Sequence, residues 1–222
     1  MHHLPQVLTA EELAALRDAL ADAVFEDGKA TAGTAIRSAK INEQLARGKE
    51  DVAALDSLVL NALSRHMLFS SLVQPKRLLA PIYSRYRPGM RYGMHVDHPI
   101  MGGAQPMRSD VSITIFLSEP SSYDGGELTI ESPGGARRIK LPAGDGIVYA
   151  TAAFHQVEPV TRGERLVAVT WAQSYVRDAE LRQILHDINA VTQSLIEKNA
   201  DAAETQLLAK CHSNLLRRFA EL

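Results

Sequence analysis

The feature that most constrains the fold is a series of short apolar segments between Leu78 and Tyr175, which turn residues separate from one another. Runs of four to eight residues bounded by glycine, proline and aspartate are typical of β-strands. Five of the runs are Ser112–Leu117, Glu127–Glu131, Arg137–Leu141, Gly146–Tyr149 and Arg165–Tyr175. About eight strands fit into the interval, and that number at regular spacing predicts a double-sheet jelly roll, whose open end can hold a ligand.

Helical periodicity precedes this region. Thr9–Glu12 has the pattern of a capping box, and apolar residues then recur at helical spacing as far as a stop near Gly28. A second helical stripe begins at Asp51. The interval between these two patterns, up to Glu50, has no clear period, and we expect a loop with some helix there.

Helical periodicity returns after Tyr175. Asp178 can cap a helix, and a second amphipathic helix follows it. The fold class is therefore mainly β with flanking helices, built on a double-stranded β-helix (jelly roll) core. The predicted parts are an N-terminal helical region packed on the core (1–77), the jelly roll (78–176) and a C-terminal helical extension (177–222).

Composition limits the setting and the partners. The chain has 222 residues, 45% of them hydrophobic, and a net charge of −2 without blocks of like charge, which argues against nucleic acid as a partner. No apolar run approaches the roughly 20 residues that span a bilayer, and the first residues lack the regions of a signal peptide. The single cysteine, Cys211, cannot form an internal disulfide. We therefore expect a cytoplasmic protein with no membrane partner.

The clearest chemical signal is the pair His95 and Asp97. In a strand these two side chains project to the same side, about 7 Å apart at Cα, and can reach one metal. A lone His-x-Asp often arises by chance, but His155 follows within a few residues of the predicted strand Gly146–Tyr149. Two histidines and one carboxylate form the facial triad that leaves open positions on a non-haem Fe(II).

Arg165 is the second chemical signal. By strand parity its guanidinium shares a face with Val167, Val169 and Trp171, and a cation on an apolar face needs a partner. An internal salt bridge or an edge position in water would satisfy it. The functional alternative is the distal carboxylate of a dicarboxylic cosubstrate, which the planar guanidinium matches. Arg162 competes for this role, but it lies in a turn, and turns face solvent.

Further stretches of the chain carry a family resemblance. They are Arg108–Ser112, Tyr123–Leu128, Leu141–Asp145 and Val157–Gly163. Together with the metal triad and Arg165, they resemble the 2-oxoglutarate/Fe(II) dioxygenases, and among these the bacterial PKHD-type (prolyl/lysyl-hydroxylase-type) group, over nearly the whole chain. The resemblance implies Fe(II) on His95, Asp97 and His155, with 2-oxoglutarate anchored by Arg165.

The resemblance also implies roles for two aromatic positions. Tyr86 stands where related prolyl hydroxylases place a tyrosine near the cosubstrate or the substrate. Phe116 departs from relatives that use a tyrosine hydroxyl on this strand to reach 2-oxoglutarate. The implied reaction combines O2, 2-oxoglutarate and a substrate and releases succinate and CO2, with ascorbate (vitamin C) as a reductant. Because Asp97 is an intact carboxylate, we expect hydroxylation rather than halogenation.

Other function classes remain open at this point. A cupin-like metal-binding jelly roll without oxygenase activity fits the fold, although it has no need for Arg165. A dioxygenase acting on nucleic-acid bases is disfavoured because no basic face carries aromatic residues. The substrate is either a small molecule, such as a siderophore, or a prolyl or lysyl side chain, and bacterial relatives suggest a link to iron uptake.

The remaining histidines and the cysteine have simpler interpretations. His98 is expected at the rim of the site, and the helical histidines His66, His186 and His212 are expected in surface or packing positions. Cys211 lies in an apolar helical stripe and is expected in the core. The apolar stripes of both C-terminal helices predict packing on the jelly roll and a possible homodimer interface.

Overall fold

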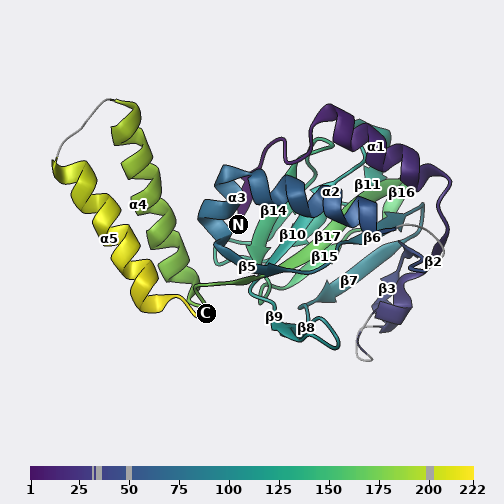
Figure 1. Ribbon diagram of the computed structural model, residues 1–222. Coiled ribbons are helices and arrows are strands. Elements are labelled where there is room, and N and C mark those ends of the chain that lie inside the picture. Colours follow the sequence, from purple (N-terminus) through teal and green to yellow (C-terminus); the bar gives the residue numbers. More distant parts are fainter. Residues whose placement is uncertain (32, 34–36, 49–51, 199–202) are drawn as a thin grey trace.

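The structure is a computed structural model that describes residues 1–31, 33, 37–48, 52–198 and 203–222. Two antiparallel β-sheets form the centre of the molecule, and helices cover the larger one (Figure 1). The larger sheet has the order β1 (His2–Leu4), β14 (Gly146–Ala150), β10 (Val111–Phe116), β17 (Arg165–Ser174), β6 (Ile82–Tyr86), β4 (Glu43–Leu45) and β2 (Phe25–Asp27), and β5 (Pro75–Leu78) also pairs with β17. The smaller sheet has the order β13 (Arg137–Ile139), β12 (Leu128–Ile130), β15 (His155–Val157), β7 (Arg91–His95) and β3 (Lys40–Ile41).

The predicted jelly roll is confirmed. Residues 78–176 contribute four strands to each sheet, β6, β10, β14 and β17 to the larger and β7, β12, β13 and β15 to the smaller. Short pairs complete this region, namely β8 (Ile100–Met101) with β9 (Met107–Arg108) and β11 (Asp124–Gly125) with β16 (Val160–Arg162), together with the 3₁₀ turn η3 (Pro120–Ser122).

Strand parity divides the core into two layers. On β10, Val111, Ile113 and Ile115 face the helices, whereas Phe116 joins the apolar cluster between the sheets. The same alternation on β17 sends Ala168 to the helical side and Val167 to the space between the sheets. The helical side is covered by α1 (Ala10–Ala21), α2 (Val52–Arg65) and α3 (Met67–Val73).

The N-terminal region contains strands as well as helices. The Thr9 capping box is present, but α1 ends at Ala21 rather than near Gly28, because Phe25–Asp27 pairs with β4 at the sheet edge. The interval predicted as a loop holds the 3₁₀ turns η1 (Gly28–Thr31) and η2 (Arg37–Ala39) and strands β3 and β4. Asp51, the expected start of the second helix, lies outside the described residues.

The C-terminal helices α4 (Ala179–Glu197) and α5 (Ala203–Phe219) form a hairpin that stands beside the sheets (Figure 1). Asp178 caps α4 as predicted. The hairpin meets the rest of the molecule mainly where α4 packs on α3, and α5 packs on α4. The hairpin therefore packs mainly on a helix of the N-terminal region, rather than on the strands of the jelly roll as we expected.

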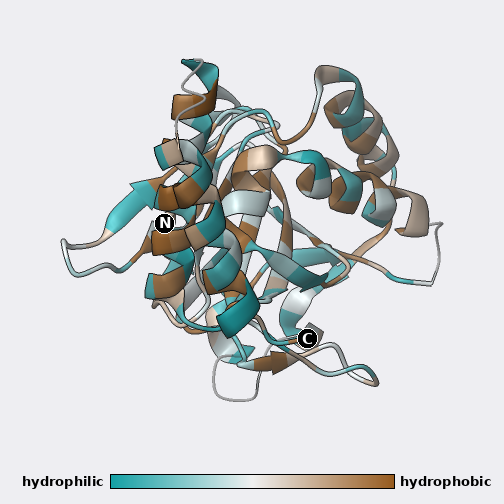
Figure 2. Cartoon of the chain, turned by 60° about the vertical axis from the view of Figure 1, so that its left-hand side comes forward, coloured by the Kyte–Doolittle hydropathy of each residue, from teal (hydrophilic) through white to brown (hydrophobic). Residues whose placement is uncertain are grey.

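The hairpin leaves much apolar surface uncovered. Brown and teal residues alternate along the helices (Figure 2), as amphipathic faces require. Large exposed apolar side chains on it are Ile184, Val191, Ile196, Leu207 and Phe219. Cys211 is exposed, so its predicted core position is wrong: α5 has α4 as its main neighbour and presents its other faces to solvent. None of the helices that the structure describes has the combination of length and apolar sequence that a membrane span requires.

Candidate metal centre

Two histidines meet on neighbouring strands of the smaller sheet. His95 ends β7 and His155 begins β15, and the sheet register places them directly opposite each other. Each residue is only 4% exposed, and the ring centroids are 4.2 Å apart. Antiparallel pairing thus brings together two imidazoles that are far apart in the sequence.

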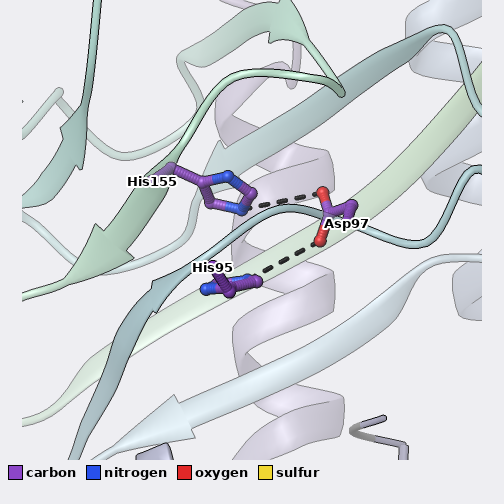
Figure 3. Close-up of side chains that lie close together, drawn as sticks. All are labelled: His95, Asp97 and His155. Carbon is purple, nitrogen blue, oxygen red and sulfur yellow. Dashed lines mark ion pairs between the residues drawn. The ribbon is translucent and has the colours of Figure 1, made fainter. Parts of the chain in front are cut away.

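Asp97 completes the group, although it lies beyond the strand. We expected Asp97 on the same strand as His95, but β7 ends at His95. The partner strand β15 begins opposite His95, so the residues after His95 have no β15 residue to pair with. The chain turns inward there. Asp97 Oδ1 lies 3.6 Å from His95 Nε2, and Asp97 Oδ2 lies 3.6 Å from His155 Nε2. Figure 3 shows the carboxylate on one side of the two imidazoles, facing both.

Hydrogen bonds orient all three side chains. His95 Nδ1 lies 2.8 Å from the Gly93 carbonyl oxygen, and His155 Nδ1 lies 3.0 Å from that of Ala153. Because a carbonyl oxygen only accepts, the proton of each ring belongs on Nδ1, and Nε2 keeps its lone pair. Such outer partners fix the tautomer of a metal-binding histidine.

The carboxylate of Asp97 is held from the larger sheet. Ser112 Oγ on β10 and Trp171 Nε1 on β17 both donate to Asp97 Oδ2, each at 2.8 Å. Oδ1 is left toward His95. Among the described residues, His95, Asp97 and His155 are the one group of potential ligands whose atoms converge, within 4.8 Å of one another.

The protonation states suit a divalent cation. Burial alone would raise the pKa of the Asp97 carboxyl, but interactions with the two histidines and with Trp171 hold this pKa below its ordinary value. Burial lowers the pKa of His155. An anionic carboxylate and neutral imidazoles are the forms that bind a metal.

Arg165 lies in the same cavity as the triad. The cavity has a volume of about 690 Å³, and Tyr86 also lines it. Arg165 is 1% exposed, with its guanidinium 5.1 Å from the Tyr86 ring and 5.6 Å from the Phe116 ring. Its Nε and Nη1 are buried and make no hydrogen bond in the part of the chain that the structure describes. The parity prediction is confirmed, and the internal salt bridge considered for Arg165 is not found among these residues.

The competing and auxiliary residues fall largely where the sequence placed them. Arg162 is exposed and bonded to Asp124 at 2.6 Å, so it lies in solvent. His98 is exposed at the cavity rim. His66 caps α3, and His186 pairs with Ser71 at 2.8 Å, as expected of packing residues.

Sequence reasoning missed the contribution of residues 40–44 to the cavity. Lys40, Asn42 and Gln44 all line it. These three polar residues occupy alternate positions, as in a strand with one polar face. The flanking residues do not continue the alternation, so the sequence alone did not distinguish this pattern from chance. The sequence analysis placed Ser112 and Trp171 on strands, but it did not predict that both would donate hydrogen bonds to Asp97.

Comparison with known proteins identifies the class. Residues 81–173 match the family model of the 2OG-Fe(II) oxygenase superfamily. A PKHD-type hydroxylase of Thermosynechococcus vestitus is 46% identical over 220 residues, covering 99% of this chain and 98% of the relative. A PKHD-type hydroxylase of Maricaulis maris is 47% identical over 219 residues, with coverage of 99% and 98%.

Solved structures share the fold. An oxidoreductase of the 2OG-Fe(II) oxygenase family from Burkholderia pseudomallei gives a TM-score of 0.55 at 20% identity and covers 76% of this chain and 82% of that chain. A prolyl hydroxylase from Trichoplax adhaerens gives 0.55 at 14% identity, with coverage of 77% and 82%. These structures show the fold, and the identity to PKHD-type hydroxylases over nearly the full length, together with the family model, makes the chain an oxygenase of the 2OG-Fe(II) superfamily.

Within that superfamily the chain belongs to the PKHD-type hydroxylases, as identity over nearly the full length of its relatives shows. The family implies Fe(II) and 2-oxoglutarate, and the predicted resemblance is confirmed. Membership decides against the cupin-like alternative without oxygenase activity.

Proposed function

We propose that His95, Asp97 and His155 bind one Fe(II), that Arg165 binds the C5 carboxylate of 2-oxoglutarate, and that the enzyme hydroxylates its substrate with release of succinate and CO2. The observation that carries this proposal is the buried guanidinium of Arg165, which has free donors in the cavity that the triad also lines. A dicarboxylate fits such a cavity, because one end can reach the metal and the other the arginine.

The side chains present fit the metal. Nε2 of both histidines and Oδ1 of Asp97 are the free ligand atoms, and nitrogen and oxygen donors of this kind suit Fe(II). When bound, the iron supplies the oxidation of an unactivated C–H bond by O2. The protein holds the imidazoles in the ligating tautomer and keeps the carboxylate charged, while the apolar cluster between the sheets limits water.

Arg165 and Tyr86 position the cosubstrate in this proposal. The guanidinium lies between aromatic rings on an inner strand, so a carboxylate that it binds is shielded from water and the pairing is strong. Tyr86 is paired in register with Arg165 and borders the same cavity. Phe116 has no hydroxyl to add, and Arg165 therefore carries the C5 carboxylate. The Asp97 carboxylate fills the position that a halide would need, which favours hydroxylation.

Anaerobic metal titration tests the ligand assignment. His155→Ala should lower the affinity for Fe(II) by orders of magnitude, because three protein ligands become two. His98→Ala, at the rim of the same cavity, is the matched control and should bind like the parent protein. Equal affinity of the His155→Ala and parent proteins would contradict the assignment of this histidine.

The finer parts of the proposal rest on the family resemblance and on the hairpin. The substrate is a small molecule or a prolyl or lysyl side chain, ascorbate returns oxidised iron to Fe(II), and the enzyme works in the cytoplasm in a pathway linked to iron uptake. Exposed apolar residues of α4 and α5 support a homodimer through the hairpin. The proposed division of the chain is an N-terminal helical region packed on the core (1–77), the jelly roll that holds the site (78–176) and a C-terminal helical extension (177–222).

A further inference from the structure

One strand segment bridges the two sheets at the cavity. Its first part, β3, pairs with β7 with Lys40 opposite Tyr92, and its second part, β4, pairs with β6 with Gln44 opposite Ser84. Lys40, Asn42 and Gln44 are alternate residues of this segment, and all three line the cavity. A polar row therefore runs along the cavity wall from the smaller sheet to the larger one.

Lys40 is a buried cation close to the metal centre. It is 5% exposed, and its Nζ donates to Thr31 Oγ1 at 2.6 Å and lies 5.0 Å from the centre of the Tyr92 ring. The Tyr92 ring also stacks on the ring of His95, with 3.7 Å between the ring centroids. In the part of the chain that the structure describes, no carboxylate lies within ion-pair distance of Lys40. The ammonium group thus has donors left for an anion.

Asn42 is a buried amide whose hydrogen-bonding capacity is largely unused. It is 4% exposed, neither Oδ1 nor Nδ2 makes a well-formed hydrogen bond among the described residues, and its polar neighbour is Tyr86, whose pKa burial raises and the amide lowers in part. Gly28 packs so closely that a Cβ there would lie 2.1 Å from Asn42 Oδ1, and Gly28 N donates to the Asn42 carbonyl at 2.9 Å. The amide is therefore held in place by its surroundings. A buried unpaired donor and acceptor are costly, and a ligand that offers both would offset this cost.

We propose that Lys40 and Asn42 form the subsite for the primary substrate, and that this substrate carries a carboxylate next to an amide, as an N-acyl amino acid or the C-terminal residue of a peptide does. This inference rests on the proposed function, in which the metal and Arg165 bind both carboxylates of 2-oxoglutarate and leave none for Lys40. The ammonium takes the substrate carboxylate, and the side-chain amide of Asn42 pairs with the substrate amide.

The neighbouring wall suits the rest of such a molecule. Leu79, Val96 and Met101 line the same cavity and offer apolar contacts. A pocket with mostly apolar walls and a few placed polar groups is typical of small-ligand recognition. The substrate side chain would contact this wall while its carboxylate stays at Lys40.

Binding of paired probes tests the inference. The probes are the N-acetyl derivatives of L-proline, L-leucine and L-lysine, and glycylglycine tripeptides ending in the same residues, each as free acid and as carboxamide. Calorimetry on the protein loaded with Ni(II) and 2-oxoglutarate gives the affinities. We expect at least one acid to bind on the order of 10- to 100-fold more tightly than its amide, as a charged hydrogen bond allows. The N-acetyl and tripeptide arms distinguish a small molecule from a peptide end.

Variants connect that preference to the two residues. Lys40→Met should remove the preference for the acid, and Lys40→Arg should keep part of it because the charge remains. Asn42→Leu should weaken acid and amide alike. Lys29→Met is the control. Lys29 lies in the neighbouring η1 turn, where its Nζ is 3.7 Å from Asp27 Oδ2, and this variant should bind like the parent protein.

The outcomes distinguish a failure of this inference from a failure of the proposed function on which it rests. If no acid binds more tightly than its amide, or if Lys40→Met keeps the preference, the carboxylate subsite is wrong. If Lys40→Met weakens 2-oxoglutarate itself, Lys40 belongs to the cosubstrate, and the inference fails while the proposed function stands. If the parent protein loaded with Ni(II) fails to bind 2-oxoglutarate, the proposed function fails first.

Discussion

Replacing Arg165 with methionine should have opposite effects on folding and on cosubstrate binding. The guanidinium is buried, and its Nε and Nη1 have no hydrogen-bond partner among the described residues. Methionine is apolar and flexible but ends near the position of Nε, so it packs toward the Tyr86 and Phe116 rings and leaves part of the guanidinium space empty at a small cost. Nε and Nη1 lose no hydrogen bond to a described residue, and the Tyr123 hydroxyl, whose pKa burial raises and Arg165 lowers in part, is the polar group that loses its neighbour.

The stability change follows from two opposing terms. Each buried donor without a partner costs about 1–3 kcal/mol, which the substitution recovers. The cation–π contacts with Tyr86 and Phe116 contribute about 0.5–2 kcal/mol each, which the substitution loses. The recovered term is the larger, and the protein without 2-oxoglutarate should gain about 1–2 kcal/mol in unfolding free energy. For a chain of this size that gain corresponds to a rise in Tm of roughly 2–8 °C.

Cosubstrate binding should change in the other direction. Loss of a buried charged pair costs on the order of 2–5 kcal/mol, which raises the Kd for 2-oxoglutarate by about 30-fold or more. Arg165→Lys should recover only part of this loss, because an ammonium cannot match the two carboxylate oxygens as a guanidinium does.

Thermal unfolding and calorimetry with the Ni(II) form, each with and without 2-oxoglutarate, measure both effects. Arg162→Met is the matched control, because this arginine lies in solvent and should affect neither quantity in the direction expected of Arg165. An Arg165→Met protein that is much less stable than its parent and still gains Tm from 2-oxoglutarate would refute the reasoning.

Three further predictions concern the metal centre, Lys40 and the hairpin. Trp171→Phe removes the 2.8 Å hydrogen bond to Asp97 and should lower the affinity for Ni(II) by about 10- to 100-fold, and unchanged affinity in a metal titration would contradict this role. Burial lowers the pKa of Lys40 from 10.5 to about 8. Between pH 8 and 10.5 the lysine is therefore protonated in the unfolded chain and neutral in the folded one. The unfolding free energy should rise with pH across this range, by up to about 3 kcal/mol. Denaturant titrations from pH 7 to 10 should show the parent gaining stability relative to Lys40→Met, because above that range the buried tyrosines, whose pKa values burial raises, lower the unfolding free energy of both proteins. Deleting residues 199–222 removes α5 from α4, and should change the oligomeric state in sedimentation while 2-oxoglutarate affinity stays the same; an unchanged state would exclude α5 from a dimer.

The His95–Asp97 part of the metal centre could be predicted because its geometry follows from short-range rules, whereas His155 reaches it through sheet pairing and was assigned from its position after a predicted strand and from the family resemblance. Strand parity placed Arg165 on the inner face with Val167 and Val169, and the structure has that arrangement. His95 and Asp97 were close enough in sequence to meet even though Asp97 leaves the strand. A site built on local spacing survives errors in the strand boundaries.

The cavity wall formed by residues 40–44 was harder to predict. Strands β3 and β4 are two and three residues long and belong to different sheets, so the chain around Lys40 and Asn42 shows no sustained alternation. Cys211 illustrates a second limit. An apolar stripe indicates that a helix face seeks a partner, but it does not say whether that partner lies within the same chain.

The arrangement of the centre couples the two sheets. Asp97 accepts hydrogen bonds from Ser112 and Trp171 of the larger sheet, while His95 and His155 belong to the smaller sheet. An ion bound by all three residues therefore fixes the sheets relative to each other at the cavity, and it stabilises the folded chain because the unfolded chain lacks the site. In the proposed function Arg165 also links cosubstrate binding to the metal. If 2-oxoglutarate bridges the metal and the arginine, each ligand must strengthen the binding of the other by the same factor, since coupling free energies are reciprocal.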